Sequence, residues 1–580
     1  MFLAHLTHEA VQKIGGIGAV LNGLITSRHY KSTVKRTVLC GPFTEEDRQL
    51  VAAGRPDLTL LPARQIEDRT AAVGLAQIER RFGVEIFHGK RRYVGGPAGV
   101  DNEVEILLID VTRMPKEHVD AVKQGLQRET GLRFDKFKLS AEDDRYVRLA
   151  VPAYEALLTL RRSKDGPCVM IAHEWFGLPL AFWIVGRRDP RFRTIFHAHE
   201  VQVVRPIVEK HPAHDIMFYN VLRTAPAQGK YLPDIFGTQE FAFRPAMVMR
   251  AHRLDRIFAV GDPIVDELRF LGPEFQNARI DLVYNGIAAP KIAPEAKIES
   301  HQRLQEYARR LVGWRPDFIF THVARPVVSK AFWRDLQVLA ALDPKLAAAG
   351  QKAVLFILAS ATYPRSAADV AKMEKAYGWP LEHKKGLPDL VGPEVAIAKA
   401  VHSFNRRAKA GRAIYVNQFG WEHGLCGTKM PKAMVFSDIR RGTDLEFGMS
   451  VYEPFGIAQI EPLPFGAICA ISRACGCCGF IERVDKNHEL PTVIIKDYAV
   501  EPKAANPARL LKMTAAQAAE IEKQIAGEIA EEVYRLLPRS EKDLKRHLAL
   551  GYRYARQMSW EIVTRDYFLN GVRQALNLPG

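Results

Sequence analysis

The sequence predicts an α/β fold with two parallel sheets, on three observations. Short apolar runs rich in β-branched residues alternate with longer amphipathic segments, which is typical of parallel strands joined by helices. The chain has 580 residues, more than one hydrophobic core usually holds. Residues 288–299 are rich in Ala, Pro and Lys, so we expect the boundary between two domains there.

The expected strands form two groups, one on each side of this boundary. The first group comprises Phe2–Leu6, Thr37–Cys40, Val104–Asp110, Cys168–Ala172, Thr194–Ala198, Arg256–Val260 and Ile280–Val283. The second group comprises Phe318–Val323, Ala353–Leu358, Ala413–Asn417, Met434–Ser437 and Ala467–Ile471. Residues 507–578 have a helical period that breaks at Pro538, because proline lacks the N–H group that a helix interior needs. The expected domains are therefore 1–290 and 300–540, followed by helices over 541–580.

Composition and charge narrow the function classes. Hydrophobic residues make up 47% of the chain, aromatic residues 9% and charged residues 26%, which excludes a disordered or fibrous protein. Lys and Arg number 82 against 66 Asp and Glu, a formal net charge of +16. This excess favours anionic partners such as nucleotides, nucleic acid or an acidic membrane, and charge alone does not choose among them.

The sequence predicts a cytoplasmic protein. The first twenty residues contain charged side chains and histidines where a signal peptide has its apolar region. The most apolar window, 167–186, is interrupted by His173 and Glu174, so no transmembrane segment is expected. Four of the seven cysteines crowd residues 469–478 without a second Cys-x-x-Cys pair, which favours reduced thiols over a metal site.

The first segment with a chemical signature is a glycine-rich turn between the first strand and a helix. It contains Glu9, Lys13, Gly15 and Gly16. Glycines let a ligand approach the backbone, the helix N-terminus offers free N–H groups, and Lys13 adds positive charge, so a phosphate fits here. The segment is neither a P-loop nor a dinucleotide fingerprint. A tight connection without a ligand is the alternative interpretation.

The second signature is a set of polar residues that follow neighbouring strands. His173 and Glu174 come after one strand, and His197 and His199 end the next. Ligands of open α/β sheets bind outside the carboxyl ends of the strands, so these residues are candidates for one crevice. No metal is expected, because no carboxylate accompanies the histidines in a known zinc-site arrangement. Structural roles for His173 and His197 stay open.

The third signature is a pair of cations, Arg325 and Lys330, after a predicted strand. Arginine can bind two phosphate oxygens at once and lysine adds a point charge, so together they suit a diphosphate leaving group. A basic, solvated loop without a ligand is the alternative.

The fourth signature is the segment 452–461. Pro454 predicts the first turn of a helix, with Glu453 in the loop before it. Glu461 lies eight residues after Glu453, about two turns further and on a similar face. Two carboxylates are costly to bury unless they bind hydroxyls or cations, whereas helix capping would account for Glu453 alone.

In order and spacing, these segments resemble the retaining GT-B glycosyltransferases, and among them the glycogen and starch synthases. The shared motifs are Lys-x-Gly-Gly, His-Asp/Glu-Trp, a strand-end His, Arg-x4-Lys, and Glu-x7-Glu with Glu-Pro-Phe-Gly. Residues 9–20, 173–175 and 214–220 are most similar to the animal and fungal glycogen synthase branch, and 284–286 and 558–561 also match the family. Residues 57–144 are the least recognisable part.

The resemblance implies a GT-B fold, in which two Rossmann-like domains face each other across a deep cleft and a C-terminal helix returns to the N-terminal domain. It implies transfer of glucose from UDP- or ADP-glucose to a glucan with retention of configuration, without a metal or another cofactor. Arg325 and Lys330 would bind the departing diphosphate, and Lys13 with the Gly15 and Gly16 amides would close over it.

The remaining roles also come from the resemblance. Glu461 would bind the ribose hydroxyls, His199 would hold the sugar beside the anomeric carbon, and Glu453 would stabilise the oxocarbenium-like charge. The other donor-binding candidates are Gly456, Gly476, Cys477 and Cys478. The other candidates for the substrate cleft are Glu9, His173, Glu174 and Asn285.

Departures from the family leave the acceptor open. Residues 476–480 read Gly-Cys-Cys-Gly-Phe where relatives carry Gly-Gly-Leu, and Lys330 is followed by Ala-Phe-Trp-Arg rather than Gly and Asp. A glucan is favoured over another polysaccharide, a sugar phosphate or a small molecule, and a homo-oligomer is allowed. A non-catalytic binder of nucleic acid or membranes is the rival class. Its basic clusters, 90–93 and 406–409, are short and match no nucleic-acid motif, so no nucleic acid is expected.

Overall fold

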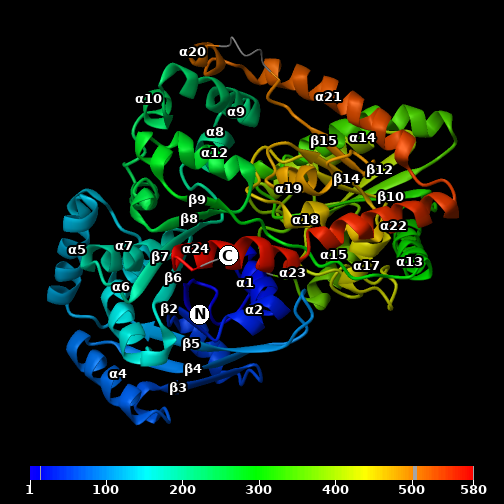
Figure 1. Cartoon of the computed structure of the whole chain (residues 1–580). Coiled ribbons are helices and arrows are strands. Elements are labelled where there is room, and N and C mark those ends of the chain that lie inside the picture. The colour runs from blue at the N-terminus through cyan, green and yellow to red at the C-terminus, as the bar shows by residue number, and fades with distance from the viewer. Residues whose placement is uncertain (14, 363, 501–505, 579–580) are drawn as a thin grey trace. The chain divides into compact units, whose positions relative to one another are not determined.

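The chain forms two compact α/β units (Figure 1). The computed structural model describes residues 1–580 except 14, 363, 501–505 and 579–580. Unit 1 consists of Met1–Val204, Pro226–Gly286 and Ser559–Gly580, and unit 2 consists of Arg205–Ala225 and Ile287–Met558. Each unit is therefore built from segments that are distant in the sequence.

Unit 1 is built on a nine-stranded sheet with the order β3-β4-β5-β2-β1-β6-β7-β8-β9. The strand pairs are parallel except for β3 with β4 and β4 with β5, which are antiparallel. The strands are β1 (Phe2–Leu6), β2 (Arg36–Pro42), β3 (Leu58–Pro62), β4 (Glu85–Tyr93), β5 (Asn102–Asp110), β6 (Cys168–His173), β7 (Phe192–Ala198), β8 (Arg256–Ala259) and β9 (Ile280–Leu282).

The helices of unit 1 lie between these strands in the sequence, except α23 and α24, which come from the end of the chain. They are α1 (Gly16–Ile25), α2 (Arg28–Thr33), α3 (Glu45–Ala52), α4 (Arg69–Phe82), α5 (Lys116–Thr130), α6 (Ala141–Leu160), α7 (Leu178–Arg187), α10 (Leu232–Phe236), α11 (Phe243–Val248), α12 (Asp262–Phe270), α23 (Trp560–Ile562) and α24 (Leu569–Ala575). The long α6 begins where the sequence has a capping box, with the Ser140 hydroxyl accepting from the Asp143 N–H.

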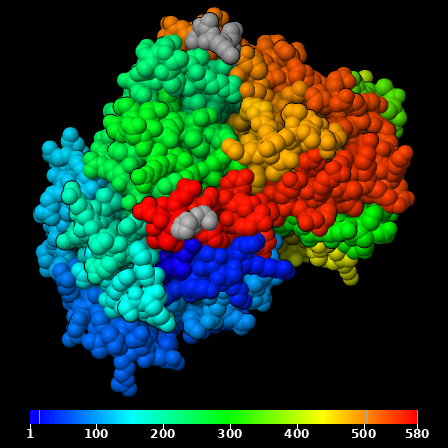
Figure 2. All heavy atoms as spheres, in the orientation of Figure 1, coloured from blue at the N-terminus to red at the C-terminus, as the bar shows by residue number. Residues whose placement is uncertain are grey.

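The C-terminal segment of the chain packs on the first residues of unit 1. Trp560 is buried and lies against Gly23 and Gly286, where a side chain would collide with its ring. The Ser27 hydroxyl donates to Glu561 at 2.7 Å. In the all-atom view the red C-terminal helices lie beside the blue N-terminal residues (Figure 2). The predicted return of the C-terminal helix to the first domain is therefore confirmed.

Unit 2 is built on a six-stranded parallel sheet with the order β12-β11-β10-β13-β14-β15. Its strands are β10 (Phe318–Val323), β11 (Ala353–Leu358), β12 (Gly411–Val416), β13 (Leu445–Gly448), β14 (Ile468–Ser472) and β15 (Val493–Lys496). These two sheets, parallel except for the pairs that β4 makes in unit 1, confirm the predicted α/β class with two Rossmann-like domains. The expectation that the sheets face each other across a cleft stays a prediction.

One predicted strand is wrong. Residues 434–437 run into a helix, α17 (Phe436–Gly442), and the strand comes later, as β13. Val435 and Phe436 are about half exposed, so their apolar side chains do not mark a core strand. Asp438 instead accepts a hydrogen bond from the Val435 N–H at 2.9 Å, which stabilises the start of the helix.

The helices of unit 2 cover its sheet. They are α8 (Val204–Lys210), α9 (His214–Thr224), α13 (Pro294–Val312), α14 (Phe332–Ala348), α15 (Ala367–Tyr377), α16 (Glu394–Asn405), α17, α18 (Ile457–Ile460), α19 (Cys477–Val484), α20 (Pro507–Leu510), α21 (Ala515–Leu536) and α22 (Glu541–Gln557). The helical break predicted at Pro538 is confirmed, because α21 ends before this residue and α22 begins after it.

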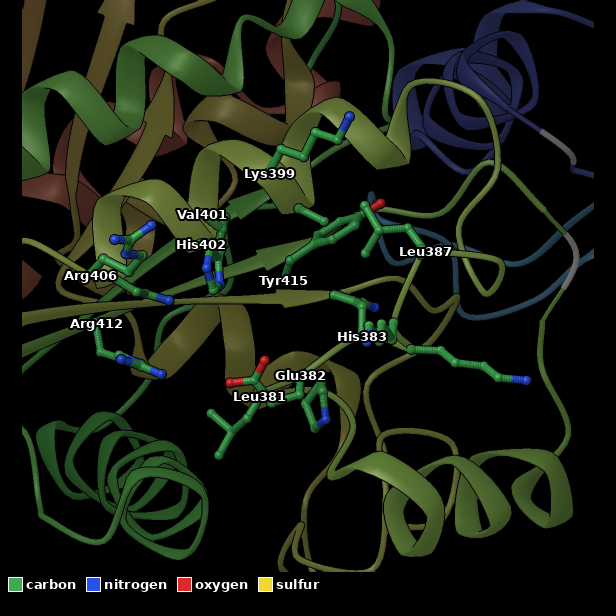
Figure 3. A pocket seen from close by; sticks show the side chains of 16 residues that line it. Leu381, Glu382, His383, Leu387, Lys399, Val401, His402, Arg406, Arg412 and Tyr415 are labelled. Carbon is green, nitrogen blue, oxygen red and sulfur yellow. The ribbon is translucent and has the colours of Figure 1, made fainter.

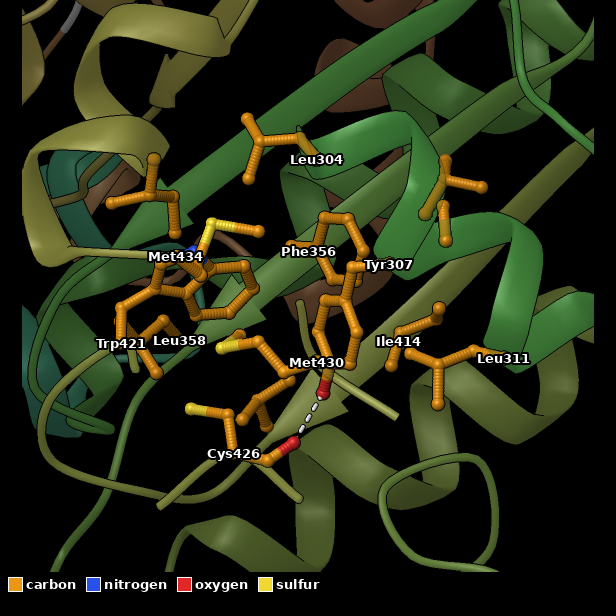
Figure 4. Packing of buried hydrophobic residues seen from close by; sticks show 14 of the residues in the cluster. Leu304, Tyr307, Leu311, Phe356, Leu358, Ile414, Trp421, Cys426, Met430 and Met434 are labelled. Carbon is orange, nitrogen blue, oxygen red and sulfur yellow. Dashed lines mark hydrogen bonds between the residues drawn. The ribbon is translucent and has the colours of Figure 1, made fainter. Parts of the chain in front are cut away.

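Aromatic side chains organise a core cluster of unit 2 (Figure 4). Tyr307 from α13 stacks on Phe356 from β11, with ring centroids 5.5 Å apart, and both meet the edge of Trp421. The Tyr307 hydroxyl donates to the backbone oxygen of Cys426 at 2.6 Å. The polar end of this buried ring is thereby paired, which lets the cluster hold α13 against the sheet.

A buried ion-pair cluster joins the segment 205–225 to the rest of unit 2. Arg334 on α14 donates to Asp215 on α9 at 2.7 and 3.0 Å and to Glu522 on α21 at 2.7 Å. All three side chains are buried. Removing one partner would leave an uncompensated charge in the interior, so the cluster strongly favours this placement of α9.

Among the helices in the described part of the chain, none has both the length and the apolar character to cross a bilayer.

Candidate functional site

Four histidines meet at the carboxyl ends of the central strands of unit 1. His5 lies on β1, His173 ends β6, His197 lies on β7, and His199 follows that strand. The parallel register places His173 opposite His197. The ring of His173 lies 5.2 Å from each of the other three rings, measured between centroids. His5 was not predicted as a site residue, although a histidine within a wholly buried strand is itself unusual.

Three of these rings form a hydrogen-bonded chain. His5 Nδ1 lies 2.9 Å from His173 Nε2, and His173 Nδ1 lies 2.9 Å from His199 Nε2. At its other end, His5 Nε2 lies 3.1 Å from the hydroxyl of Tyr30, which reaches Thr37 at 2.8 Å. A neutral imidazole has one N–H donor and one acceptor nitrogen, so the tautomer of one ring determines that of the next.

Burial keeps all four imidazoles neutral. It lowers the pKa of His5 and of His199 to about 3. The pKa of His173 and of His197 also lies well below the ordinary value, because burial disfavours the charged ring and the neighbouring histidines add to the effect. The cluster therefore acts at neutral pH through hydrogen bonds rather than through positive charge.

The same cluster could hold a metal ion. One nitrogen each from His173, His197 and His199 lie within 4.8 Å of one another. Both ring nitrogens of His197 are buried and have no hydrogen-bond partner among the described residues. Neutral imidazoles are common zinc ligands, so the expectation of no metal stays a prediction.

Glu9 and Glu174 shape the loops beside the histidines. Glu9 is buried and accepts a hydrogen bond from the Gly15 N–H at 2.7 Å. A Cβ on Gly18 would come within 2.3 Å of the Glu9 carboxylate, so only glycine fits there. Glu174 has a positive φ of 56° and accepts from the Glu200 N–H at 2.7 Å. Both carboxylates thus position backbone around the histidines.

The glycine turn leads into α1 as predicted. Gly15 is the N-cap of this helix, which starts at Gly16. Lys13, Gly15 and Gly16 are exposed, so an anion can reach the helix start. The Gly15 N–H, however, is already bound by Glu9. Asn285 follows β9 in the same unit, and its buried side-chain oxygen has no partner among the described residues.

The second group of predicted residues meets in unit 2, where Lys330 and Glu453 form an ion pair. The Gln459 side chain donates to the same carboxylate at 3.0 Å. Burial is the largest single influence and would raise the pKa of Glu453, but Lys330, Gln459 and Arg205 together outweigh it, and the pKa is lowered. Glu453 is therefore a largely buried, ionised carboxylate, with its side chain 13% exposed.

Backbone hydrogen bonds bring these two motifs together. Residues 328–330 form a single 3₁₀ turn after β10, and the Ser329 carbonyl accepts from the Val451 N–H at 2.8 Å. Arg205 donates to the Ser329 hydroxyl at 3.0 Å and lies over the ring of Tyr452. Arg325 is exposed near the end of β10. Neither Arg205 nor Gln459 was predicted, since no local pattern marks either residue.

The helix expected at Pro454 begins later, and that prediction is wrong. α18 starts at Ile457, after Gly456 adopts a left-handed conformation with φ 94°. A residue with this φ interrupts a right-handed helix, so Pro454 lies in the preceding loop. Glu461 ends the helix and pairs with Arg440 at 3.0 Å. It therefore has a cationic partner and is not two helical turns beyond Glu453.

The segment 476–478 supports the loop of Glu453 through its backbone amides, and its role in donor binding stays a prediction. The Gly476 N–H donates to the Glu453 carbonyl at 3.0 Å, and the Cys477 N–H donates to the Phe455 carbonyl at 2.8 Å. The thiols of Cys477 and Cys478 are buried. Burial also raises the pKa of the Cys477 thiol. All seven cysteines are free.

Comparisons with known proteins give a likeness only at the level of the fold. No protein-family model matches the chain, and no curated protein matches it. One similar solved structure is a UDP-forming α,α-trehalose-phosphate synthase from Burkholderia xenovorans, with 14% identity over 99% of both chains and a TM-score of 0.49. Another is a sucrose-phosphate synthase from Thermosynechococcus elongatus, with 11% identity over 99% of both chains and a TM-score of 0.49. Values this low carry no statement about activity or substrate.

Proposed function

We propose that the chain is a retaining glycosyltransferase that uses a nucleoside-diphosphate sugar. The observation that carries the proposal is the largely buried, ionised Glu453 beside Lys330 and Gln459. A carboxylate at this place can stabilise positive charge that develops on an anomeric carbon. The ammonium group of Lys330 has three N–H donors, so it can bind Glu453 and a phosphate oxygen together.

The finer proposal is a glycogen synthase-like transfer of glucose from UDP- or ADP-glucose to a glucan. It rests on the motif resemblance. Arg325 and Lys330 bind the diphosphate, and their charges neutralise the leaving group without a fixed metal. The acceptor hydroxyl attacks from the face that the leaving oxygen vacates, so configuration is retained.

His199 is assigned to the sugar hydroxyls. The chain from Thr37 through Tyr30, His5 and His173 orients its ring. Because all the rings are neutral, His199 presents a hydrogen-bonding nitrogen rather than a charge. Another polysaccharide, a sugar phosphate or a small molecule is the alternative acceptor.

The deciding experiment is turnover of UDP-glucose and ADP-glucose by Glu453→Gln. Glutamine keeps the size of the side chain and an oxygen for Lys330, so the fold should persist while kcat falls about a hundred- to a thousandfold. The matched control is Glu520→Gln, which neutralises an exposed glutamate on α21 and should leave kcat unchanged. Near-normal turnover of Glu453→Gln would refute the role of this carboxylate.

A second experiment compares ligands of different charge. Arg325→Ala and Lys330→Ala should weaken binding of the nucleoside diphosphate far more than binding of the nucleoside, because both side chains are assigned to the phosphates. Calorimetric titration measures both affinities. Equal losses for the two ligands would show that these residues have a structural role.

A further inference from the structure

A pocket lies in unit 2 (Figure 3), and neither Lys330 nor Glu453 lines it. Its volume is about 700 Å³, and it is lined by the loop 380–387, helix α16 and strand β12. This volume is typical of sites for small molecules. β12 is the edge strand of the sheet, and β11 separates it from β10, which leads to Arg325 and Lys330. The pocket is therefore a different site from the one proposed for the donor.

The pocket is strongly basic, and its cations lack protein partners. Five Lys and Arg side chains line it, against the single carboxylate of Glu382. In the part of the chain that the structure describes, no hydrogen bond or ion pair engages any of the five side chains. They are Lys384, Lys385, Lys399, Arg406 and Arg412. Like charges that gather without counter-charges repel one another, and a bound anion would relieve this repulsion.

Two of these cations are arginines that lie on one side of the pocket. Arg406 follows the end of α16, and Arg412 lies at the start of β12. Figure 3 shows both side chains on the same side of the pocket as His402. Guanidinium groups bind phosphate oxygens through paired N–H donors, so this side suits a phosphoryl group.

The inner wall carries buried polar groups that also lack partners. The hydroxyl of Tyr415 has none among the described residues, although the side chain is 1% exposed. His383 contacts Asp389 through Nδ1 at 2.9 Å, and its buried Nε2 is unpaired. Because Nδ1 of His383 donates a hydrogen bond to the Asp389 carboxylate, Nε2 of the neutral ring is a hydrogen-bond acceptor. An acceptor nitrogen and a phenol at the wall of a pocket suit a ligand that carries hydroxyl groups.

We propose that this pocket is a second ligand site, which binds a small phosphate ester that carries hydroxyl groups. Arg406 and Arg412 hold the phosphoryl oxygens, and Tyr415 and His383 bind the hydroxyls. The apolar side chains of Leu381 and Val401 line the same cavity and exclude water from these contacts. The proposal does not depend on the function proposed for Lys330 and Glu453.

Calorimetric titration of the full chain tests the proposal with ribose 5-phosphate, inorganic phosphate and ribose as probes. Ribose 5-phosphate should bind more tightly than inorganic phosphate, because it engages both walls, and ribose alone should bind weakest. The double variant Arg406→Gln/Arg412→Gln should weaken ribose 5-phosphate about tenfold or more, which is the scale of one charge-assisted hydrogen bond. Tyr415→Phe should weaken ribose 5-phosphate and leave inorganic phosphate unchanged.

Two controls make the result specific. Arg407→Gln removes the same charge from the neighbouring exposed residue, which does not line the pocket, and should leave binding unchanged. Lys330→Ala should also leave binding unchanged, which separates this site from the donor site even where the proposed transferase activity fails. Circular dichroism checks that each variant is folded.

Three results would overturn the proposal. The first is no binding of ribose 5-phosphate at millimolar concentrations. The second is an equal loss of affinity in the Arg407→Gln control and in the Arg406→Gln/Arg412→Gln variant, since that would indicate general electrostatics. The third is stronger binding of a single-stranded oligonucleotide that the same double variant abolishes, since that would assign the pocket to nucleic-acid phosphates.

Discussion

Acid should destabilise unit 1 through four neutral histidines, the buried His5, His173 and His197 and the partly buried His199. Their pKa values are lowered by burial in the folded chain, to about 3 for His5 and His199. In the unfolded chain a histidine has a pKa of about 6.5. Below this pH the unfolded state binds more protons than the folded state, so the free energy of unfolding falls as the pH falls from about 6.5 towards about 3.

The size of the effect follows from these values. One histidine that stays neutral in the folded state costs about 2 kcal/mol of stability between pH 7 and pH 5. Four such groups together approach about 8 kcal/mol, which is comparable with the whole stability of a typical domain. The destabilisation should be absent above about pH 7, where the folded and the unfolded chain are both neutral.

His197→Phe tests this reasoning with little disturbance to hydrogen bonding. Both ring nitrogens of His197 lack partners among the described residues, so phenylalanine removes a titrating group and breaks no hydrogen bond in that part of the chain. The loss of stability between pH 7 and pH 5 should be about 2 kcal/mol smaller than in the wild type. His29→Phe, at a half-exposed position on α2, is the matched control and should retain the wild-type pH dependence.

Urea unfolding at several pH values gives the free energies, and hydrogen exchange with mass spectrometry shows whether the peptides of unit 1 open first. An identical pH dependence for His197→Phe and the wild type would refute the claim that this ring is neutral in the fold. Loss of protection confined to unit 2 would likewise refute the assignment of the acid sensitivity to the histidine cluster.

Three further predictions concern stability. Gly23→Ala should lower the stability of unit 1 by about 1–3 kcal/mol, because the new Cβ would lie 2.1 Å from the Trp560 ring. The control, Gly527→Ala on α21, meets nothing within 4 Å and should raise stability by about 0.5–1 kcal/mol. Thermal unfolding that ranks the two variants the other way would contradict the packing. Arg334→Met should destabilise unit 2 by about 3–5 kcal/mol, measured by urea unfolding, since Asp215 and Glu522 would stay buried without a cation. Adding Asp215→Asn and Glu522→Gln to this variant should recover most of the lost stability. No recovery would count against the ion-pair cluster. Deleting residues 559–580 should expose the surface that Trp560 covers and increase binding of a hydrophobic dye, and unchanged dye binding would show that the returning helices are dispensable.

Much of the architecture follows from local sequence patterns. Central parallel strands such as β6 and β10 are buried on both faces, so they read as continuous apolar runs that need no tertiary information. Strands β3, at the edge of the sheet, and β4, beside it, were missed because half-exposed residues interrupt the apolar run in both. The false strand at 434–437 shows the converse, since exposed apolar residues imitate a core strand.

The candidate site likewise combines motifs that are visible in the sequence with contacts that only the tertiary structure determines. The motifs around Glu453 and Lys330 are visible in the sequence because each is a compact run of unusual residues. The ion pair between these two residues, which are 123 positions apart, depends on the tertiary structure. So does the chain from His5 to His199, since His5 comes next to His173 only through the pairing of β1 with β6.

Tertiary structure alone also decided which unit holds α9 and where the basic pocket forms. Asp215 reaches its partner Arg334 across 119 positions of the chain, and the two arginines of the pocket come from a helix end and a strand start that look like ordinary solvated residues in the sequence. Periodicity and turn chemistry act between residues a few positions apart, so a sequence reveals them directly. Ion pairs and cavities depend on which surfaces meet after the chain has folded, and that is determined by the packing of the whole unit.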